Sequence, residues 1–157
     1  DDTRGFHSMM AIPAELSLRR TPDGIRLAFQ PVRELDAMRG EPLFLPRRSD
    51  SAEFPLADTP CELLFCCKPN QLLTLTIGDT VLTAENSRLH IQPVLGQDAV
   101  DAHLDVNEPI RVILDRGAIE VFANGGTFWA ALEAEGDLLT KTISIAGAEG
   151  LKVYPLH

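Results

Sequence analysis

The sequence predicts an all-β protein built as an antiparallel sandwich of two sheets. Three observations predict it. Apolar and polar residues alternate in many short segments, turn signals separate nearly all of these segments, and no long helical pattern occurs. Short strands at spacings of about ten residues are typical of β-sandwiches. With 157 residues, of which 45% are hydrophobic, the chain is long enough for a core and fits one domain over residues 1–157.

The strands are expected where the alternation has a period of two. In chain order these segments are residues 15–20, 24–30, 72–77, 80–84, 88–92, 99–106, 110–114, 118–123, 127–133, 141–146 and 151–154, and residues 61–67, which hold the three cysteines, are also taken as a strand. Pro22-Asp23-Gly24 is expected to close the first hairpin, and Gly78-Asp79 forms a two-residue hairpin loop. Residues 1–20 therefore comprise a leading segment followed by the first strand.

Two stretches depart from this pattern. Residues 32–39 have a helix-like spacing, and residues 41–60 are charged and rich in proline, with Pro42, Pro46, Pro55 and Pro60. Because proline interrupts the hydrogen-bond ladder of a sheet, residues 41–60 are interpreted as a long connection that crosses between the two sheets.

Composition excludes several classes of partner. Fourteen Lys and Arg residues against 23 Asp and Glu give a formal charge of −9, which disfavours binding to nucleic acid or to an anionic membrane. The chain has no run of 18 apolar residues and does not open with a basic segment followed by an apolar one, so neither a membrane span nor a signal peptide is expected. The cellular location stays open.

Cysteine and histidine do not indicate a metal site. Cys66 and Cys67 are adjacent, so on a strand they point to opposite faces, and no second cluster completes a four-ligand set with Cys61. The three cysteines are therefore expected to be free thiols, and no metal or cofactor is expected. The sequence also lacks the G-x-S-x-G, G-x-x-x-x-G-K-[ST] and H-E-x-x-H motifs.

Residues 110–126 are predicted to form two strands joined by a tight turn and closed by Asn-Gly-Gly. Asp115, Arg116 and Glu120 then gather at one rim of a sheet, where they could bind sugar hydroxyls through charge-assisted hydrogen bonds. Two other interpretations stay open. Asp115 and Glu120 could act as an acid pair for glycoside cleavage, although Arg116 would hold both carboxylates ionised. Alternatively, the turn only satisfies its own backbone and pairs its charges locally.

Aromatic residues are too few for a large sugar-stacking platform. Trp129 and Tyr154 are the only tryptophan and tyrosine in the sequence. Trp129 is expected to pack in a core or against a neighbouring domain. Any sugar recognition would then depend on hydrogen bonds.

Four segments resemble one protein family. Residues 4–19 are similar to W-R-G-x-M-[ST]-[LI]-P-R-E-L-[ST]-L, residues 27–35 to L-x-Q-x-P-V-x-E-L, residues 115–122 to D-R-S-x-[VI]-E-[VS]-F, and residues 151–156 to the closing strand. These segments resemble the C-terminal sandwich of family 32 glycoside hydrolases, the invertases, levanases and inulinases. Departures are Thr3 for Trp, Ala14 for Arg, and Gly117-Ala118 for Ser-Ser.

The resemblance implies a concanavalin- or lectin-like jelly roll and an accessory role. The family's catalytic domain is a five-bladed propeller with the strings W-M-N-D-P-N-G, R-D-P and E-C, and none of these occurs in residues 1–157. The chain is therefore expected to have no catalysis of its own and to stabilise the propeller of a β-fructosidase acting on sucrose, levan or inulin.

Two alternatives remain. The chain could be a stand-alone fructan-binding module, and the resemblance then makes Asp115, Arg116 and Glu120 the residues that would bind a terminal fructose. It could also be a small glycosidase of concanavalin-like fold. In the accessory role, the leading segment is expected to present an apolar face to the propeller through Phe6, Met9, Met10 and Ile12.

Overall fold

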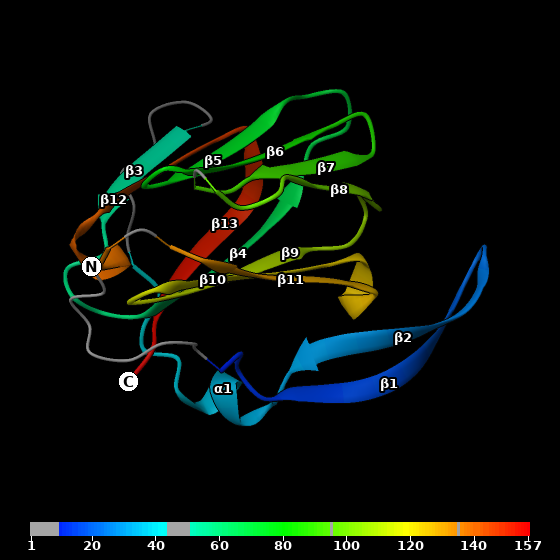
Figure 1. The fold of residues 1–157 in the computed structure, drawn as a ribbon, viewed down its shortest axis with the longest axis horizontal. Helices are drawn as coiled ribbons and strands as arrows, with labels where there is room; N and C mark the ends of the chain where they lie inside the picture. Colours follow the sequence, from blue (N-terminus) through cyan, green and yellow to red (C-terminus); the bar gives the residue numbers. More distant parts are fainter. Residues whose placement is uncertain (1–9, 44–50, 95, 135) are drawn as a thin grey trace.

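The computed structural model describes residues 10–43, 51–94, 96–134 and 136–157, and within them the chain forms a β-sandwich with a third layer on one face (Figure 1). The elements are β1 Ala14–Thr21, β2 Gly24–Pro31, α1 Glu34–Ala37, β3 Ser51–Pro55, β4 Cys61–Cys67, β5 Leu73–Ile77, β6 Thr80–Glu85, β7 Arg88–Gln92, β8 Val100–His103, β9 Ile110–Asp115, β10 Ala118–Ala123, η1 Asn124–Gly126, β11 Phe128–Glu133, η2 Leu138–Thr140, β12 Thr142–Ala146 and β13 Ala148–Pro155.

Two antiparallel sheets face each other. One has six strands in the order β3-β12-β5-β6-β7-β8, and the other has five in the order β11-β10-β9-β4-β13. The predicted antiparallel sandwich is confirmed, and most strand boundaries agree with the alternation to within two residues. No helix in the described part of the chain is long and apolar enough to cross a membrane.

The core lies between the two sheets because each strand turns alternate side chains inward. In β9, Ile110, Val112 and Leu114 are buried in this core, whereas Arg111 and Asp115 belong to the opposite face. The other sheet contributes its own inward residues, such as Leu75 and Ile91. The second face of the five-stranded sheet, which points away from this core, is called the outer face.

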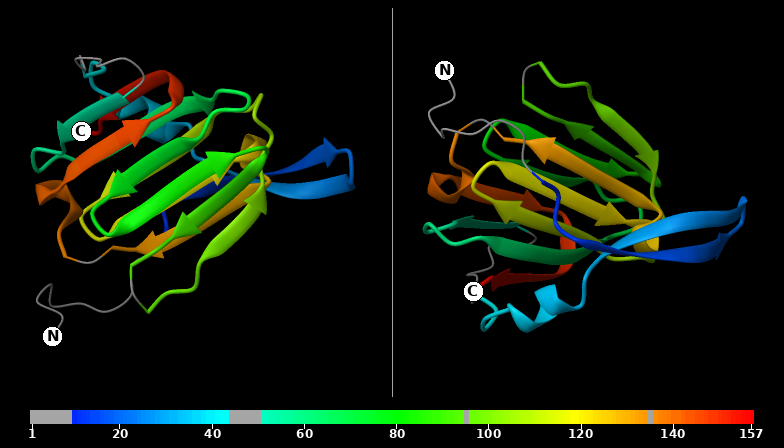
Figure 2. Two further views of the ribbon diagram at one scale, coloured as in Figure 1. Left: turned by 90° about the horizontal axis from the view of Figure 1, so that it is seen from above. Right: turned by 60° about the horizontal axis from the view of Figure 1, so that its bottom comes forward.

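The first hairpin stands apart from both sheets. Strands β1 and β2 pair only with each other and turn at Pro22-Asp23-Gly24, where Gly24 has a φ of +111°. The two views of Figure 2 show the hairpin extending well beyond one end of the sandwich. Together with α1 it forms the third layer, which lies against the outer face (Figure 1). Alternation predicted the hairpin but not this separate position.

The prediction that residues 41–60 form one connection is wrong. Ser51–Pro55 is strand β3, which pairs with β12 at the edge of the six-stranded sheet. Proline is tolerated there because an edge strand needs hydrogen bonds on one side only. Pro46 and the rest of residues 44–50 lie outside the described residues. The helix-like segment 32–39 contains only the short helix α1, flanked by turns.

The three cysteines are free thiols on β4 and differ in environment. Cys61 and Cys67 are buried in the core, whereas Cys66 points to the other face and is half-buried. Burial, and secondarily the charge of Glu62, raises the pKa of Cys61 to about 12. Burial, with a smaller contribution from Cys66, raises the pKa of Cys67 to about 11.

Alkylation should therefore distinguish the thiols. At pH 8 a thiol with a pKa of about 12 is a thiolate in roughly one molecule in ten thousand, and only the thiolate reacts. We expect iodoacetamide to modify Cys66 in the native protein and all three cysteines in urea, as read by peptide mass spectrometry. Equal labelling of Cys61 and Cys66 in the native protein would contradict the burial of Cys61 in the core.

Candidate functional site

The outer face carries two buried carboxylates. Glu62 on β4 is 0% exposed and Glu120 on β10 is 3% exposed. Both residues pair with Ile113 on the central strand β9, one from each side, so they lie two strands apart on the same face. A buried carboxylate is costly unless hydrogen bonds or cations satisfy it. The partners of each one therefore indicate what it does.

Two arginines hold Glu62. Arg39, which follows α1, donates to both carboxylate oxygens at 2.5 and 3.0 Å, and Arg111 on β9 forms an ion pair with the same group. Both guanidinium groups also reach Asp36 of α1, at 3.0 Å from Arg39 and 2.9 Å from Arg111. The bond to Glu62 is the main cause that raises the pKa of Arg39 above its ordinary value.

This four-residue network attaches the α1 region to the sheet. The Arg39 guanidinium also lies 4.9 Å from the ring centroid of Tyr154 on β13, a cation–π contact. The network was not predicted from the sequence. The sequence signal for this network is a charged residue at an outer position within an apolar run, Glu62 in β4 and Arg111 in β9, whose last residue, Asp115, is also charged.

Glu120 attaches the leading segment. One carboxylate oxygen accepts the backbone N–H of Ile12 at 2.7 Å, and the other accepts Nε1–H of Trp129 at 3.0 Å. The Trp129 ring stacks on Phe29 of β2 and on Phe122 of β10, with centroids 5.3 and 6.3 Å apart. Trp129 therefore packs in a small apolar cluster under the third layer, which agrees with the expectation of a packing role.

Replacing Glu120 by glutamine should loosen the leading segment. A glutamine side chain can accept only one of the two N–H groups, and its own NH2 group then faces a donor. We expect the free energy of unfolding to fall by about 1–3 kcal/mol and the Ile12 amide to exchange faster with deuterium. Trp129→Phe, which removes one donor and keeps the acid, should leave exchange at Ile12 closer to wild type. Unchanged exchange in Glu120→Gln would contradict this role.

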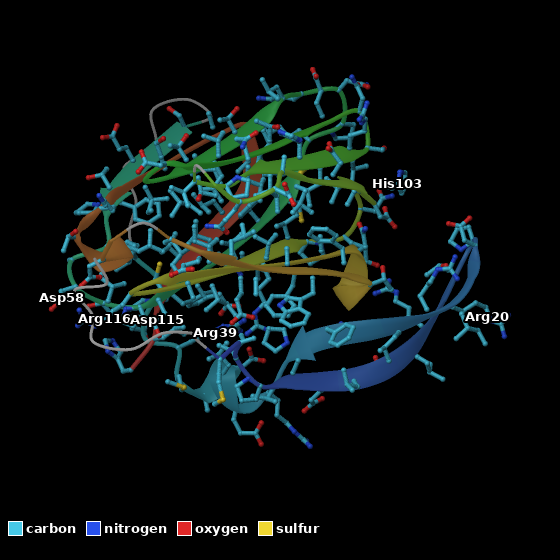
Figure 3. The ribbon with its side chains drawn as sticks, viewed as in Figure 1. Arg20, Arg39, Asp58, His103, Asp115 and Arg116 are labelled. Atoms are coloured by element: carbon cyan, nitrogen blue, oxygen red, sulfur yellow. The ribbon has the colours of Figure 1, made fainter. Side chains whose placement is uncertain are left out.

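The three predicted rim residues differ in their surroundings. Asp115 and Arg116 lie at the β9–β10 turn, at the end of the sandwich opposite the hairpin, where Figure 3 shows them beside Asp58. Glu120 shares a face with Asp115, but it is covered by the leading segment and bonded to Ile12 and Trp129. Asp115 and Arg116 therefore remain at the turn, whereas Glu120 bonds the leading segment, and a joint sugar-binding role of the three residues stays a prediction.

The rim residues are engaged with protein groups. The Asp115 carboxylate accepts the backbone N–H of Arg116 at 2.7 Å. The Arg116 guanidinium contacts Asp58 at 3.2 Å and Asp137 at 2.7 Å, and these carboxylates raise its pKa. Asp137 in turn caps η2 by accepting the N–H of Leu139 at 3.0 Å. These contacts hold together the β3–β4, β9–β10 and β11–β12 connections. A sugar-binding role of these residues stays a prediction.

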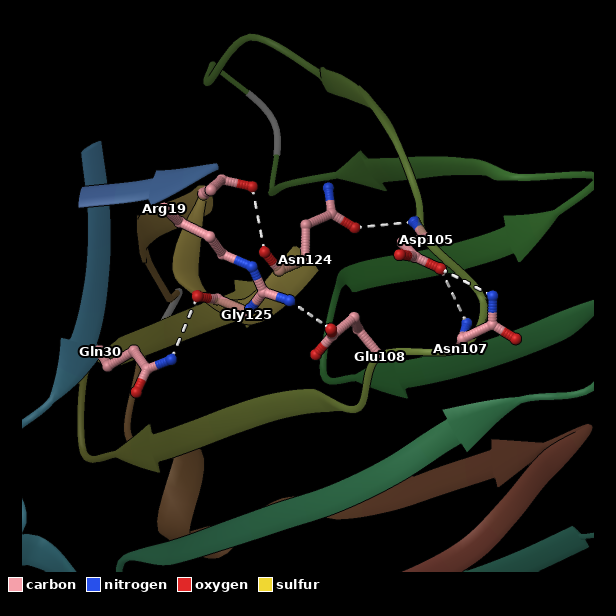
Figure 4. A network of polar contacts seen from close by, with 8 residues as sticks. Arg19, Gln30, Asp105, Asn107, Glu108, Asn124 and Gly125 are labelled. Atoms are coloured by element: carbon pink, nitrogen blue, oxygen red, sulfur yellow. Dashed lines mark hydrogen bonds and ion pairs between the residues drawn. The ribbon is translucent and has the colours of Figure 1, made fainter. Parts of the chain in front are cut away.

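A second polar network fastens the hairpin to the sandwich (Figure 4). Arg19 of β1 forms an ion pair with Glu108, and Nε2–H of Gln30 in β2 donates to the carbonyl of Gly125 at 3.1 Å. Asn124 accepts the N–H of Asp105 at 2.8 Å and donates to the carbonyl of His103 at 2.7 Å. The turn predicted at Asn-Gly-Gly therefore serves as the attachment point of the hairpin.

The predicted inter-domain residues divide into three cases. Met10 is 95% exposed, as expected for a residue that contacts another domain. Ile12 is half-buried and packs against the apolar cluster of the outer face, so part of it is covered by this chain. Phe6 and Met9 lie outside the described residues. Their roles as inter-domain contacts stay predictions.

Three surface depressions in the described part of the chain include acidic residues. One, of about 210 Å³, is lined by Glu120 and Glu133 together with Met10 and Ala11, and both oxygens of Glu120 are already bonded to protein groups. A second, of about 510 Å³, lies over β3, β12 and β5 and includes Glu53, and a third, of about 80 Å³, includes Glu85. Among the described residues, no group of three or more His, Cys, Asp or Glu could hold a metal ion.

Comparison with known proteins finds similarity in structure only. No family model matches the chain, and no curated protein is similar to it in sequence. Among solved structures, it is similar to an exo-inulinase from Aspergillus awamori, with a TM-score of 0.76 and 14% identity over 100% of this chain. It is also similar to a family 32 glycoside hydrolase from Bifidobacterium adolescentis, with a TM-score of 0.72 and 19% identity over 94% of this chain.

A third similar structure is a sucrose-6-phosphate hydrolase from Lactobacillus gasseri, with a TM-score of 0.68 and 13% identity over 90% of this chain. The chain spans 37%, 25% and 33% of these three solved chains, respectively. At such identities the likeness shows the fold. The fold of this chain is thus that of one part of larger hydrolases.

Proposed function

We propose that the chain is the non-catalytic C-terminal sandwich of a family 32 glycoside hydrolase, where it stabilises a five-bladed catalytic propeller. The parent enzyme would be a β-fructosidase acting on sucrose, levan or inulin. One observation carries this proposal. The structural likeness extends over 100% of this chain but over only 37% of the exo-inulinase, as expected for an accessory part of such an enzyme.

Two further observations support the accessory role. The four sequence segments that resemble the family lie in the order expected for its C-terminal sandwich, and the three catalytic strings are missing from residues 1–157. In addition, the carboxylates of the outer face are committed to holding the structure together. Glu62 accepts hydrogen bonds from Arg39 and forms an ion pair with Arg111, and Glu120 accepts hydrogen bonds from Ile12 and Trp129.

The proposal predicts that the purified chain releases no fructose from sucrose, inulin or levan. Cleavage of a glycosidic bond needs two free carboxyl groups on either side of the bond, and these are assigned to the propeller. Fructose release is measured with a coupled enzymatic assay after two rounds of purification. Turnover that survives purification and disappears in Asp115→Asn would overturn the proposal and favour a small glycosidase.

The parent gene gives the complementary test. The reading frame that encodes this chain should contain W-M-N-D-P-N-G before residue 1, and removal of residues 1–157 from its product should speed thermal inactivation of fructose release. Inactivation at an unchanged rate would contradict the stabilising role. Calorimetry with fructose and levan on wild type and Arg116→Ala then tests the fructan-binding alternative, in which Arg116→Ala removes the heat of binding.

A further inference from the structure

The hairpin has an apolar side that nothing in the described chain covers. Leu16 pairs with Phe29, Leu18 with Leu27, and Arg20 with Ile25, and directly paired residues lie on the same face of a hairpin. Exposed aliphatic side chains therefore line up on this face: Leu16 at 62%, Leu18 at 76%, Ile25 at 59% and Leu27 at 47%. These four residues are called the hairpin stripe.

The opposite face of the hairpin is the one fastened by polar contacts. Arg19, which forms the ion pair with Glu108, belongs to that face, as do Gln30, which bonds Gly125, and Ala28, which is buried. The hairpin is thus fixed to the sandwich while the stripe stays open. A two-stranded hairpin is marginally stable alone, so exposing its apolar side needs an explanation.

The hairpin stripe continues the apolar contact between the base of the hairpin and the outer face of the five-stranded sheet. Phe29 shares the face of the stripe and stacks on Trp129, which belongs to the apolar cluster of the outer face. The covered apolar layer therefore begins under the base of the hairpin and continues, uncovered, toward the tip. Figure 3 marks that direction with Arg20, which lies on the hairpin beyond the end of the sandwich. Arginine is enriched in protein interfaces.

We propose that the hairpin stripe is the surface on which the catalytic domain of the same polypeptide docks. This inference rests on the proposed function and names the surface through which the stabilisation acts. Met10, which is 95% exposed, precedes the first stripe residue, Leu16, by six positions, so the chain that enters the sandwich leads into the open apolar face. A preceding domain would meet Leu16 and Leu18 within a few residues of its own end.

The size of the stripe favours a tethered domain over a second copy of this chain. Four partly exposed aliphatic side chains offer on the order of 400 Å², about half of the ~800 Å² that each partner buries in a stable complex of free molecules. A covalently linked domain needs less contact, because the linker holds it at a millimolar or higher effective concentration. The stripe is therefore adequate for an intramolecular partner and too small for a stable dimer.

The test uses the full-length parent protein with charge-changing substitutions on the two faces of β1–β2. Leu18→Asp/Leu27→Asp places two negative charges in the stripe, and Ser17→Asp/Arg26→Asn, which lowers the net charge by the same two units, is the matched control on the opposite face. We expect the stripe variant to lose fructose-releasing activity at least tenfold faster than wild type on heating and the control to change less than threefold. Hydroxyl-radical labelling of the unmodified full-length protein should oxidise Leu18 at least fivefold less than Leu72, which is 50% exposed in this chain.

The outcomes separate the two proposals. If the parent releases fructose, but the stripe variant inactivates no faster than the control and Leu18 is oxidised as readily as Leu72, the docking surface is wrong and the proposed function stands. If the stripe variant does not fold, the labelling alone decides. If the parent reading frame encodes no propeller strings and releases no fructose, the proposed function fails and the docking proposal fails with it.

Discussion

Replacing Glu62 by glutamine is expected to lower the free energy of unfolding by about 3–5 kcal/mol, because it breaks a buried ion-pair network from its centre. The Glu62 side chain is 0% exposed and its oxygens face the guanidinium groups of Arg39 and Arg111. The amide keeps the shape of the acid but leaves two largely buried positive charges with Asp36 as their remaining counter-charge. Urea unfolding monitored by circular dichroism measures the change.

Glu53→Gln is the matched control for this prediction. Glu53 lies on β3, an edge strand, and is exposed, so the same chemical change should alter the free energy of unfolding by less than about 0.5 kcal/mol. If Glu62→Gln costs no more than Glu53→Gln, the network does not hold α1 to the sheet. The midpoint should shift without a change in slope, because the same surface is exposed on unfolding.

Substituting alanine for Gly126 should detach the hairpin. Gly126 has a φ of +92°, and a Cβ atom there would lie 2.4 Å from the carbonyl oxygen of Phe29 and 2.9 Å from Cγ of Gln30. Because the nearest of these atoms is backbone, strand β2 itself must move. We expect a loss of at least about 2 kcal/mol beyond the cost of the left-handed backbone, which for alanine is about 1–2 kcal/mol.

Gly96→Ala separates the two effects. Gly96 has a φ of +97°, nearly that of Gly126, but beyond its chain neighbours no atom of the described residues lies within 4 Å of the position of its Cβ. It should therefore show the backbone cost alone. Detachment of the hairpin from the sandwich is measured as faster hydrogen exchange of the Val32 amide. This N–H donates to the carbonyl of Pro13 at 3.1 Å, at the base of the hairpin. Equal stability of the two variants, with Val32 protected in both, would mean that η1 does not hold β2.

Alternation predicted the sandwich because burial between two sheets requires it. Every inward residue of β9 is apolar, and the short loops at Pro22-Asp23-Gly24 and Gly78-Asp79 fix neighbouring strands as hairpins. Strand β3 was not predicted because Pro55 was taken as a sign of a loop. A proline is compatible with this edge strand, since it does not break a hydrogen bond to the neighbouring strand β12. Sequence alternation predicts which face of a strand is buried, but it predicts poorly which strands lie at the edge of a sheet.

The outer face could not be predicted in the same way. Glu120 is five residues from Asp115, and both belong to the same side of the sheet, so the sequence suggested a cluster at the rim. Which of them is covered depends on Ile12, more than a hundred residues away, and sequence periodicity carries no such long-range information. Likewise, the charge of Glu62 within an apolar strand indicates a buried partner but does not identify Arg39 or Arg111.

The third layer has a consequence for the order of folding during synthesis. Residues 10–43 leave the ribosome before the groups that hold them, which are Glu62, Arg111, Glu120, Gly125 and Pro155, whose carbonyl accepts the N–H of Gly40 at 2.8 Å. The hairpin therefore lacks its stabilising partners, and its apolar side stays exposed, until nearly the whole sandwich has been translated. Contacts between residues this far apart in sequence form slowly. In the proposed parent enzyme a propeller would be translated before the hairpin, and the hairpin would then meet that propeller before it meets its own sandwich.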